Sequence, residues 1–166
     1  MIMSVTGHRP DRLFKSDPYS KKNQAGLTTF AVECLKNLKP DTVLTGMALG
    51  WDTAIAQACV ELDIPFEAIL PCVGQDSRWP PSSQSTYKGL LSKASKIHLV
   101  FDGTFDENRK CMTERNIHLV DNSDHLLALW DGDESGGTAH CYRYARSKDR
   151  QIKNGWKRWI QWREDL

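Results

Sequence analysis

Short apolar runs alternate with longer amphipathic segments along most of the chain. The runs have the length of buried strands, and the longer segments carry apolar residues at helical spacing, as Leu27, Phe30 and Cys34 do. The predicted strands are Ile2–Thr6, Thr42–Thr45, Phe66–Leu70, Lys96–Phe101 and His125–Trp130. The predicted helices are Asn23–Leu38, Asp52–Leu62, Tyr87–Ala94, Cys111–Val120 and Thr138–Ser147.

Strands that alternate with helices predict an α/β fold with a mainly parallel sheet, because each connection must cross back over the sheet. Right-handed crossovers place helices on both faces. We therefore expect a Rossmann-like three-layer αβα sandwich of about five or six strands. Residues 1–166 are expected to form one domain, with 153–166 as a tryptophan-rich helix or tail. Such sheets bind ligands beyond the carboxyl ends of their strands.

The net charge and the cysteine spacing disfavour several kinds of binding partner and bound group. The chain has 22 basic and 21 acidic residues among 166, a formal net charge of +1, so no global attraction to nucleic acid or a membrane is expected. The five cysteines form no Cys-x-x-Cys pair, which disfavours a disulfide framework or a zinc site. We expect free thiols, a cytoplasmic location, no metal and no cofactor. Neither a signal peptide nor a membrane-spanning run is predicted.

Polar residues follow the first predicted strand directly. Gly7 permits a tight turn or a close approach to a ligand. Arg9 can hold a phosphate or carboxylate with two hydrogen bonds, and His8 can donate to a ligand or act as an acid or base. A solvated turn with a surface arginine is an equally good interpretation of these residues alone.

The segment after the second predicted strand contains Gly46, Ala48, Gly50 and Asp52. Two glycines four positions apart before a helix favour an anion site made by backbone N–H groups. Asp52 either caps that helix or accepts hydrogen bonds from a ribose or a base. The segment is neither a Walker loop nor the Gly-x-Gly-x-x-Gly dinucleotide fingerprint.

Two later regions add candidates of different kinds. Trp79 lies in the longest predicted loop and either stacks on a base or seals the loop to the body of the protein. Arg115 and Asn116 are about 100° apart on a predicted helix, so one of them is expected to point inward. A buried arginine needs a partner, and the partner is either Asp121 or an anionic ligand.

A second glycine pair precedes the last predicted helix of the sheet region. Gly136, Gly137 and Thr138 can cradle a phosphate with backbone N–H groups and a hydroxyl. A capped helix behind a flexible acidic loop, which includes Asp131, is the alternative. Two such helix starts in one parallel-sheet domain favour a nucleotide-like ligand.

Taken together, the loops resemble the YpsA-like proteins of the SLOG superfamily, across roughly residues 1 to 150. The resemblance is carried by Gly7-His8-Arg9-Pro10, Thr45-Gly46-Met47-Ala48-Leu49-Gly50-Trp51-Asp52, Pro71-Cys72, Arg115-Asn116 and Gly136-Gly137-Thr138. It implies a Rossmann-like fold and a pocket for a nucleotide-derived small molecule, built from these loops. Paired subunits are common in this superfamily, so a homo-oligomer is expected.

Branches of the superfamily imply different activities. One branch senses signalling nucleotides related to ADP-ribose, and a stand-alone domain of that type implies a sensor without its effector or a sponge for the signal. The chain also resembles LOG-like phosphoribohydrolases, but His140, Cys141 and Tyr142 occupy the region where their glutamate is expected. N-glycoside cleavage would then depend on Asp52 or Asp131. The DprA-like branch binds single-stranded DNA, which the net charge of +1 disfavours. A structural or interaction role for the tryptophan-rich tail is a further alternative.

Overall fold

The computed structural model describes residues 1–166, which form six strands and seven helices. The strands are β1 (Ile2–Gly7), β2 (Thr42–Thr45), β3 (Phe66–Leu70), β4 (Lys96–Leu99), β5 (His125–Leu129) and β6 (Gln151–Asn154). The helices are α1 (Pro10–Leu13), α2 (Lys21–Leu38), α3 (Trp51–Leu62), α4 (Pro81–Leu91), α5 (Cys111–Asp121), α6 (Gly137–Ser147) and α7 (Trp156–Glu164).

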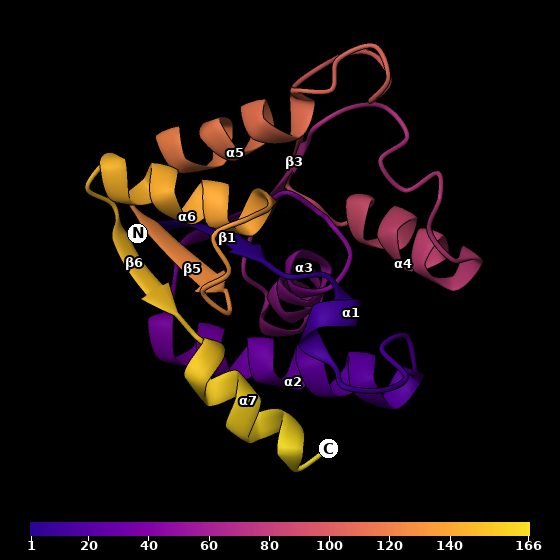
Figure 1. Ribbon diagram of the computed structural model, residues 1–166, viewed down its shortest axis with the longest axis vertical. Helices are drawn as coiled ribbons and strands as arrows, with labels where there is room; N and C mark the ends of the chain where they lie inside the picture. Colours follow the sequence, from indigo (N-terminus) through magenta and orange to yellow (C-terminus); the bar gives the residue numbers. More distant parts are fainter.

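All six strands belong to one sheet in the order β4-β3-β2-β1-β5-β6, and every neighbouring pair is parallel. Helices α5 and α6 lie on one face of this sheet, and α2, α3 and α7 lie on the other (Figure 1). The predicted α/β, three-layer, Rossmann-like sandwich is therefore confirmed. The sheet is wholly parallel and six-stranded, at the upper end of the predicted strand number.

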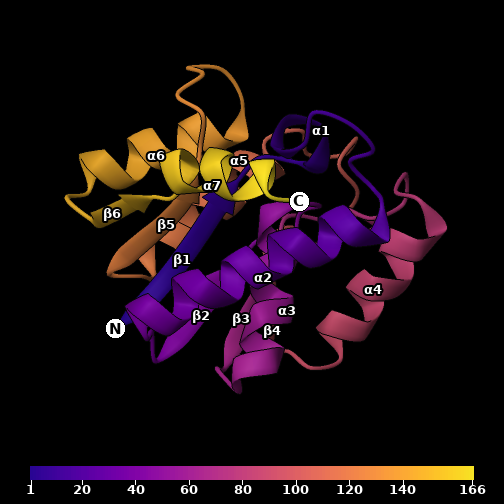
Figure 2. The same cartoon turned by 90° about the horizontal axis from the view of Figure 1, so that it is seen from below.

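The tryptophan-rich tail is part of the core. Trp159 of α7 is fully buried, and its Nε1 donates a hydrogen bond to the Leu13 carbonyl at 3.1 Å. Its ring lies 5.3 Å from that of Phe30 in α2, which in turn lies 5.8 Å from Trp51 in α3. Helix α7 crosses beside α2, as Figure 2 also shows. The tail thus packs on the body of the protein, and Trp159 has no surface to offer a partner.

Several element boundaries differ from the prediction for identifiable reasons. Helix α4 begins at Pro81 and not at Tyr87, because proline is well accommodated in a first helical turn. Helix α3 begins one residue early, at Trp51, so Asp52 lies inside its first turn and does not cap it. Strand β6 was not predicted, because Gln151–Asn154 is a mostly exposed edge strand without an apolar run.

The strand order reverses at β1, and a ligand site is expected at the point of reversal. The chain passes from β1 outward through β2, β3 and β4, and then returns to the other side of β1 as β5. The loops that follow β1 and β5 consequently diverge onto opposite faces of the sheet and leave a crevice between them. Ligands of open α/β sheets bind in such a crevice, at the carboxyl ends of the strands.

Candidate functional site

A cavity of about 460 Å³ lies at this crevice. Five regions of the chain form its walls: the end of β1 with the following turn, α1, the β2–α3 loop, α5, and the start of α6. The volume falls within the range of small-molecule sites, roughly 300–1,000 Å³. Apolar residues contribute only four of the 16 residues of the wall, so the cavity suits a polar ligand.

Ten of the thirteen predicted ligand-binding residues lie along this cavity. They are Gly7, His8, Arg9, Ala48, Asp52, Arg115, Asn116, Gly136, Gly137 and Thr138. Gly46 and Gly50 lie behind its wall, and Trp79 lines a neighbouring cavity. The sequence prediction missed the other six lining residues, which are Val5, Thr6, Arg12, Met112, Leu119 and Ser135. Pro10 is a helix-start signal that would have revealed α1 and placed Arg12 one turn after Arg9.

Arg115 is the buried cation of the cavity, with a side chain only 7% exposed. Its Nη1 donates to the Gly46 carbonyl at 2.7 Å and its Nε donates to Asn116 Oδ1 at 3.1 Å. None of the ion pairs in the chain involves Arg115. The guanidinium is therefore oriented by neutral acceptors, and its charge has no carboxylate within 4.0 Å.

Of the two partners that the sequence allows for Arg115, an anionic ligand and Asp121, the structure excludes Asp121. Asp121 accepts a hydrogen bond from the Tyr144 hydroxyl at 2.8 Å and does not pair with Arg115. Arg115 and Asn116 are both buried, although only one of them was expected to point inward. Both can be buried because α5 packs against the sheet on one side and against α6 on the other. Asn116 faces α6, where its Nδ2 donates to the Gly137 carbonyl at 3.1 Å.

Asp52 is the buried carboxyl of the cavity, at 5% exposure. Its Oδ2 accepts the Ala48 N–H at 3.2 Å, while its Oδ1 is buried and accepts no hydrogen bond within the chain. Burial raises the pKa of Asp52 from 3.8 to about 6, against the opposing effect of the Arg115 charge. Asp52 thus has an unused acceptor and a pKa close to neutrality.

The start of α6 forms the opposite wall. Gly136 precedes the helix in a backbone conformation with φ of +92°, which side chains rarely adopt. No atom lies within 4 Å of a Cβ built at Gly136, and at Gly137 only Asn116 Nδ2 does, at 3.9 Å. The first N–H groups of a helix have no intrahelical partner, so they are available to an anion here.

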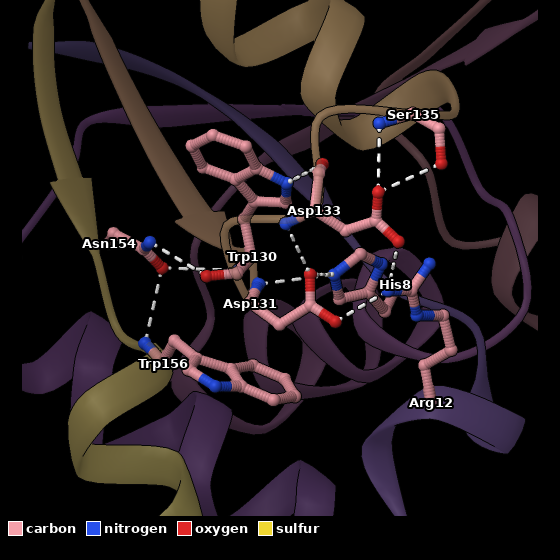
Figure 3. A network of polar contacts seen from close by, with 8 residues as sticks. All are labelled: His8, Arg12, Trp130, Asp131, Asp133, Ser135, Asn154 and Trp156. Atoms are coloured by element: carbon pink, nitrogen blue, oxygen red, sulfur yellow. Dashed lines mark hydrogen bonds and ion pairs between the residues drawn. The ribbon is translucent and has the colours of Figure 1, made fainter.

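A polar network holds the loop between β5 and α6 in place (Figure 3). Arg12 Nη2 donates to Asp131 Oδ2 at 2.6 Å and to Asp133 Oδ2 at 2.9 Å. Asp133 Oδ1 in turn accepts the Ser135 N–H and hydroxyl, both at 2.9 Å. These hydrogen bonds and the nearby Arg12 charge lower the pKa of Asp133 to about 2. The network therefore stays ionised and fixes the entry to α6.

Asp131 belongs to this network and does not line the cavity. Burial alone would raise its pKa, but hydrogen bonds from the Asp133 N–H and Arg12 lower the pKa overall. His8 Nε2 lies 3.1 Å from the Asp131 N–H and 2.9 Å from its Oδ1. Burial lowers the pKa of His8 in spite of this carboxylate, so the neutral ring accepts the Asp131 N–H. The Asp131 N–H therefore fixes the orientation of the His8 ring. Of the two candidate carboxylates, only Asp52 faces the cavity.

Trp79 is buried and packs edge-on against Tyr87, with ring centroids 5.0 Å apart. The adjacent Cys72 is also buried, and burial raises the pKa of its thiol to about 11, so the thiol is not ionised near neutral pH. All five cysteines are free and buried. No three His, Cys, Asp or Glu side chains gather closely enough to hold a metal ion. None of the helices is both long and apolar enough to cross a lipid bilayer.

Comparison with known structures reproduces the fold. DprA, DNA processing protein A, of Streptococcus pneumoniae superposes with a TM-score of 0.61 at 16% identity; 90% of this chain matches 48% of DprA, about half of its length. Helicobacter pylori DprA, for which a single-stranded DNA binding mode is described, gives 0.60 at 18% identity, over 92% of this chain and 63% of that protein. The structural genomics target TM1055 superposes with a TM-score of 0.57 at 17% identity, over 91% of this chain and 71% of that protein.

Sequence comparison identifies the family. A UPF0398 protein of Bacillus pumilus (strain SAFR-032) is 27% identical over 158 residues, which cover 88% of this chain and 82% of the relative. A UPF0398 protein of Bacillus cereus (strain G9842) is 24% identical over 165 residues, which cover 92% of this chain and 86% of the relative. The model of the YpsA family, described as the YspA SLOG family, matches residues 3–160. The chain therefore belongs to the YpsA, or YspA SLOG, family.

Proposed function

We propose that the chain binds a nucleotide-derived small molecule in the cavity between β1 and β5, as a sensor or a sponge for that molecule. The observation that carries the proposal is the position of Arg115. A buried guanidinium without a carboxylate partner faces the same cavity as the free N–H groups at the start of α6. An unpaired buried charge is costly, and a bound phosphate would neutralise it.

The phosphate is expected between α6 and the arginines. Backbone N–H groups and the Thr138 hydroxyl would donate from one side, in the manner of helix N-termini that bind phosphate. Arg115 would donate from the other side. Arg9 is exposed, has no ion pair and lies at the rim of the cavity, so it is free to close over the bound group.

The sugar or base is expected on the Asp52 side. The unused Oδ1 can accept a hydrogen bond from a ribose hydroxyl or a base N–H. A hydroxyl donor also suits a carboxyl with a pKa of about 6, because the hydrogen bond favours the ionised form. Gly46, Ala48 and Gly50 then serve the site by placing Asp52 and Arg115, which is a more indirect role than the sequence suggested.

A mixed nucleotide panel tests the proposal. The protein is incubated with nucleoside monophosphates, NAD, ADP-ribose and cyclic ADP-ribose variants, and free compounds are measured by mass spectrometry before and after heat denaturation. A binder removes one compound, which returns intact on heating. Arg9→Ala is expected to weaken this binding by about 10- to 100-fold, since it removes hydrogen bonds to a charged group.

Arg146→Ala is the matched control. Arg146 is also exposed and without an ion pair, but it lies in the last turn of α6 and does not line the cavity. Equal binding by the Arg9 and Arg146 variants would show that the anion lies elsewhere. If the wild-type chain removes no compound from the panel, the proposal fails for these ligand classes.

A second candidate function is hydrolysis of an N-glycosidic bond in the same ligand, and Asp52 favours it. Cleavage of a glycosidic bond passes through an oxocarbenium-like transition state that a nearby carboxylate stabilises. Asp52 is the carboxyl that faces the cavity, whereas the Asp131 carboxylate is held by Arg12. In the same assay, a hydrolase would return base and ribose phosphate. Asp52→Asn would then keep binding and abolish turnover, whereas a ligand that always returns intact contradicts this candidate.

A further inference from the structure

A second and larger cavity adjoins the first. It measures about 800 Å³ and is lined by the loop after β3, the loop after β4, and Tyr19 before α2. The two cavities share Arg9 and Met112. The exposed and unpaired Arg9 therefore stands between two hollows and can contact a ligand that enters both.

Exposed apolar side chains gather at the second cavity. Only five large hydrophobic residues of the chain are exposed, and three of them line it: Tyr19 at 42%, Val73 at 50% and Phe105 at 43%. They come from three different loops, so sequence proximity does not explain the cluster. Trp79 adds a buried aromatic ring to the same wall. Tyr19 and Phe105 are aromatic, and aromatic rings exposed around a cavity favour a planar ring as the occupant.

Arginines surround these apolar groups. Arg9, Arg78 and Arg109 all line the cavity, and Asp106 is its one acidic residue. Arg109 Nη2 lies 3.3 Å from Asp106 Oδ1, and its guanidinium carbon lies 6.0 Å from the centre of the Phe105 ring. Arg9 and Arg78 form no ion pair. The wall thus carries an excess of positive charge beside aromatic surface.

We infer that the ligand is of the dinucleotide type, with two ring-bearing ends joined by phosphates. This inference rests on the proposed function. One end occupies the cavity beside Arg115 and Asp52, the linking phosphates contact Arg9, and the second ring lies against Phe105 and Tyr19. Each cavity alone has the volume of a small-molecule site, and the arginine that they share lies where an anionic linker would pass from one to the other.

Matched probes separate the two cavities. Binding is measured by isothermal titration for each of the four nucleoside monophosphates and for the symmetric dinucleoside diphosphate of the same base. Both ends of a symmetric probe are identical, so statistics alone gives a factor of about two. We expect the dinucleotide of the preferred base to bind at least tenfold more tightly than its monophosphate. Phe105→Ala should remove that gain and leave monophosphate binding unchanged.

Ile97→Ala controls for loss of an exposed apolar side chain, because Ile97 is 51% exposed and lies on β4 outside these cavities. The Ile97→Ala variant should still bind the dinucleotide at least tenfold more tightly than the monophosphate. A dinucleotide that binds no better than twofold, or a Phe105→Ala variant that keeps the gain, overturns the inference while monophosphate binding upholds the proposed function. No binding of either probe class overturns the inference, and no binding of any compound in the nucleotide panel overturns the proposed function as well. Tighter binding of a single-stranded oligonucleotide than of any dinucleotide, lost in Phe105→Ala, would assign the second cavity to nucleic acid instead.

Discussion

Two loops of this chain look alike in sequence and differ in structure. Both the β2–α3 loop, with Gly46 and Gly50, and the β5–α6 loop, with Gly136 and Gly137, place two glycines before a helix. In the first loop the glycines meet other atoms: a Cβ at Gly46 would lie 2.2 Å from Arg115 Nη1, and one at Gly50 would lie 2.5 Å from the His8 carbonyl. In the second loop, the space around the glycines is open.

The backbone N–H groups of the two glycine loops also differ in whether they already have hydrogen-bond partners. In the first loop, the Met47 N–H donates to Thr45 Oγ1, the Ala48 N–H to Asp52 Oδ2, and the Trp51 N–H to the His8 carbonyl. These donors are thus already used inside the protein. In the second loop, the N–H groups of Asp133 and Ser135 donate to the Asp131 and Asp133 carboxylates of the same loop, and Arg12 holds these carboxylates from α1. The first N–H groups of α6 have no such partner and are left to the cavity. A glycine pair before a helix is therefore a packing device in one loop and a candidate anion site in the other.

Gly46→Ala is expected to have the largest effect. The added methyl group would overlap the guanidinium of Arg115, which is fixed by the Gly46 carbonyl and Asn116. Overpacking and the loss of buried charge-assisted hydrogen bonds together should lower the free energy of unfolding by about 3 kcal/mol or more. Urea unfolding measures this. Gly89→Ala is the control, since Gly89 lies on α4 with open space at its Cβ, and this variant should gain up to about 1 kcal/mol.

Asp52→Asn tests the electrostatics of the first loop through pH. Burial raises the pKa of Asp52 to about 6 from 3.8, so the folded chain holds this proton more tightly than the unfolded chain. The stabilising contribution of the protonated carboxyl is present below pH 4 and is lost as the pH rises to 6 and beyond. At about 1.4 kcal/mol per pH unit, the loss is up to about 3 kcal/mol.

The asparagine variant has no proton to lose there. Its free energy of unfolding, measured in urea, should therefore rise relative to wild type by up to about 3 kcal/mol between pH 4 and pH 7. A difference between the two proteins that stays constant across this range would mean that the Asp52 carboxyl keeps its ordinary pKa in the folded chain.

Gly136→Ala has an intermediate expected effect. The Cβ has free space, but φ of +92° with ψ of 178° is a conformation that essentially only glycine adopts. We expect a loss of about 1–2 kcal/mol in the free energy of unfolding, from backbone strain and not from overlap. If thermal unfolding shows a loss as large as that of Gly46→Ala, the second loop is also a packing device and the distinction between the loops fails.

The sequence predicted the α/β order and most of the cavity wall, because buried parallel strands give continuous apolar runs and the site residues follow those strands directly. It did not predict β6, an exposed edge strand with polar residues. It also could not separate the two glycine loops. What distinguishes Gly46 from Gly137 is the guanidinium of Arg115, 69 residues away in the chain, and that contact exists only in the folded state. Self-association stays a prediction, which a mass measurement in solution tests.

Gly137→Ala should have the smallest effect on stability and a large effect on function. Gly137 is the first residue of α6 and is exposed, and its added methyl group would make only an ordinary contact with Asn116. The free energy of unfolding should therefore stay within about 0.5 kcal/mol of wild type. The same methyl group would enter the space proposed for the phosphate, next to the N–H groups that bind it. We expect at least a tenfold weaker affinity, measured by titration with the compound that the wild type removes from the nucleotide panel. A stable variant with unchanged affinity would place the anion away from α6 and leave Arg9 and Arg115 as its only anchors, while a stable variant that fails to bind would establish the division between the two glycine loops.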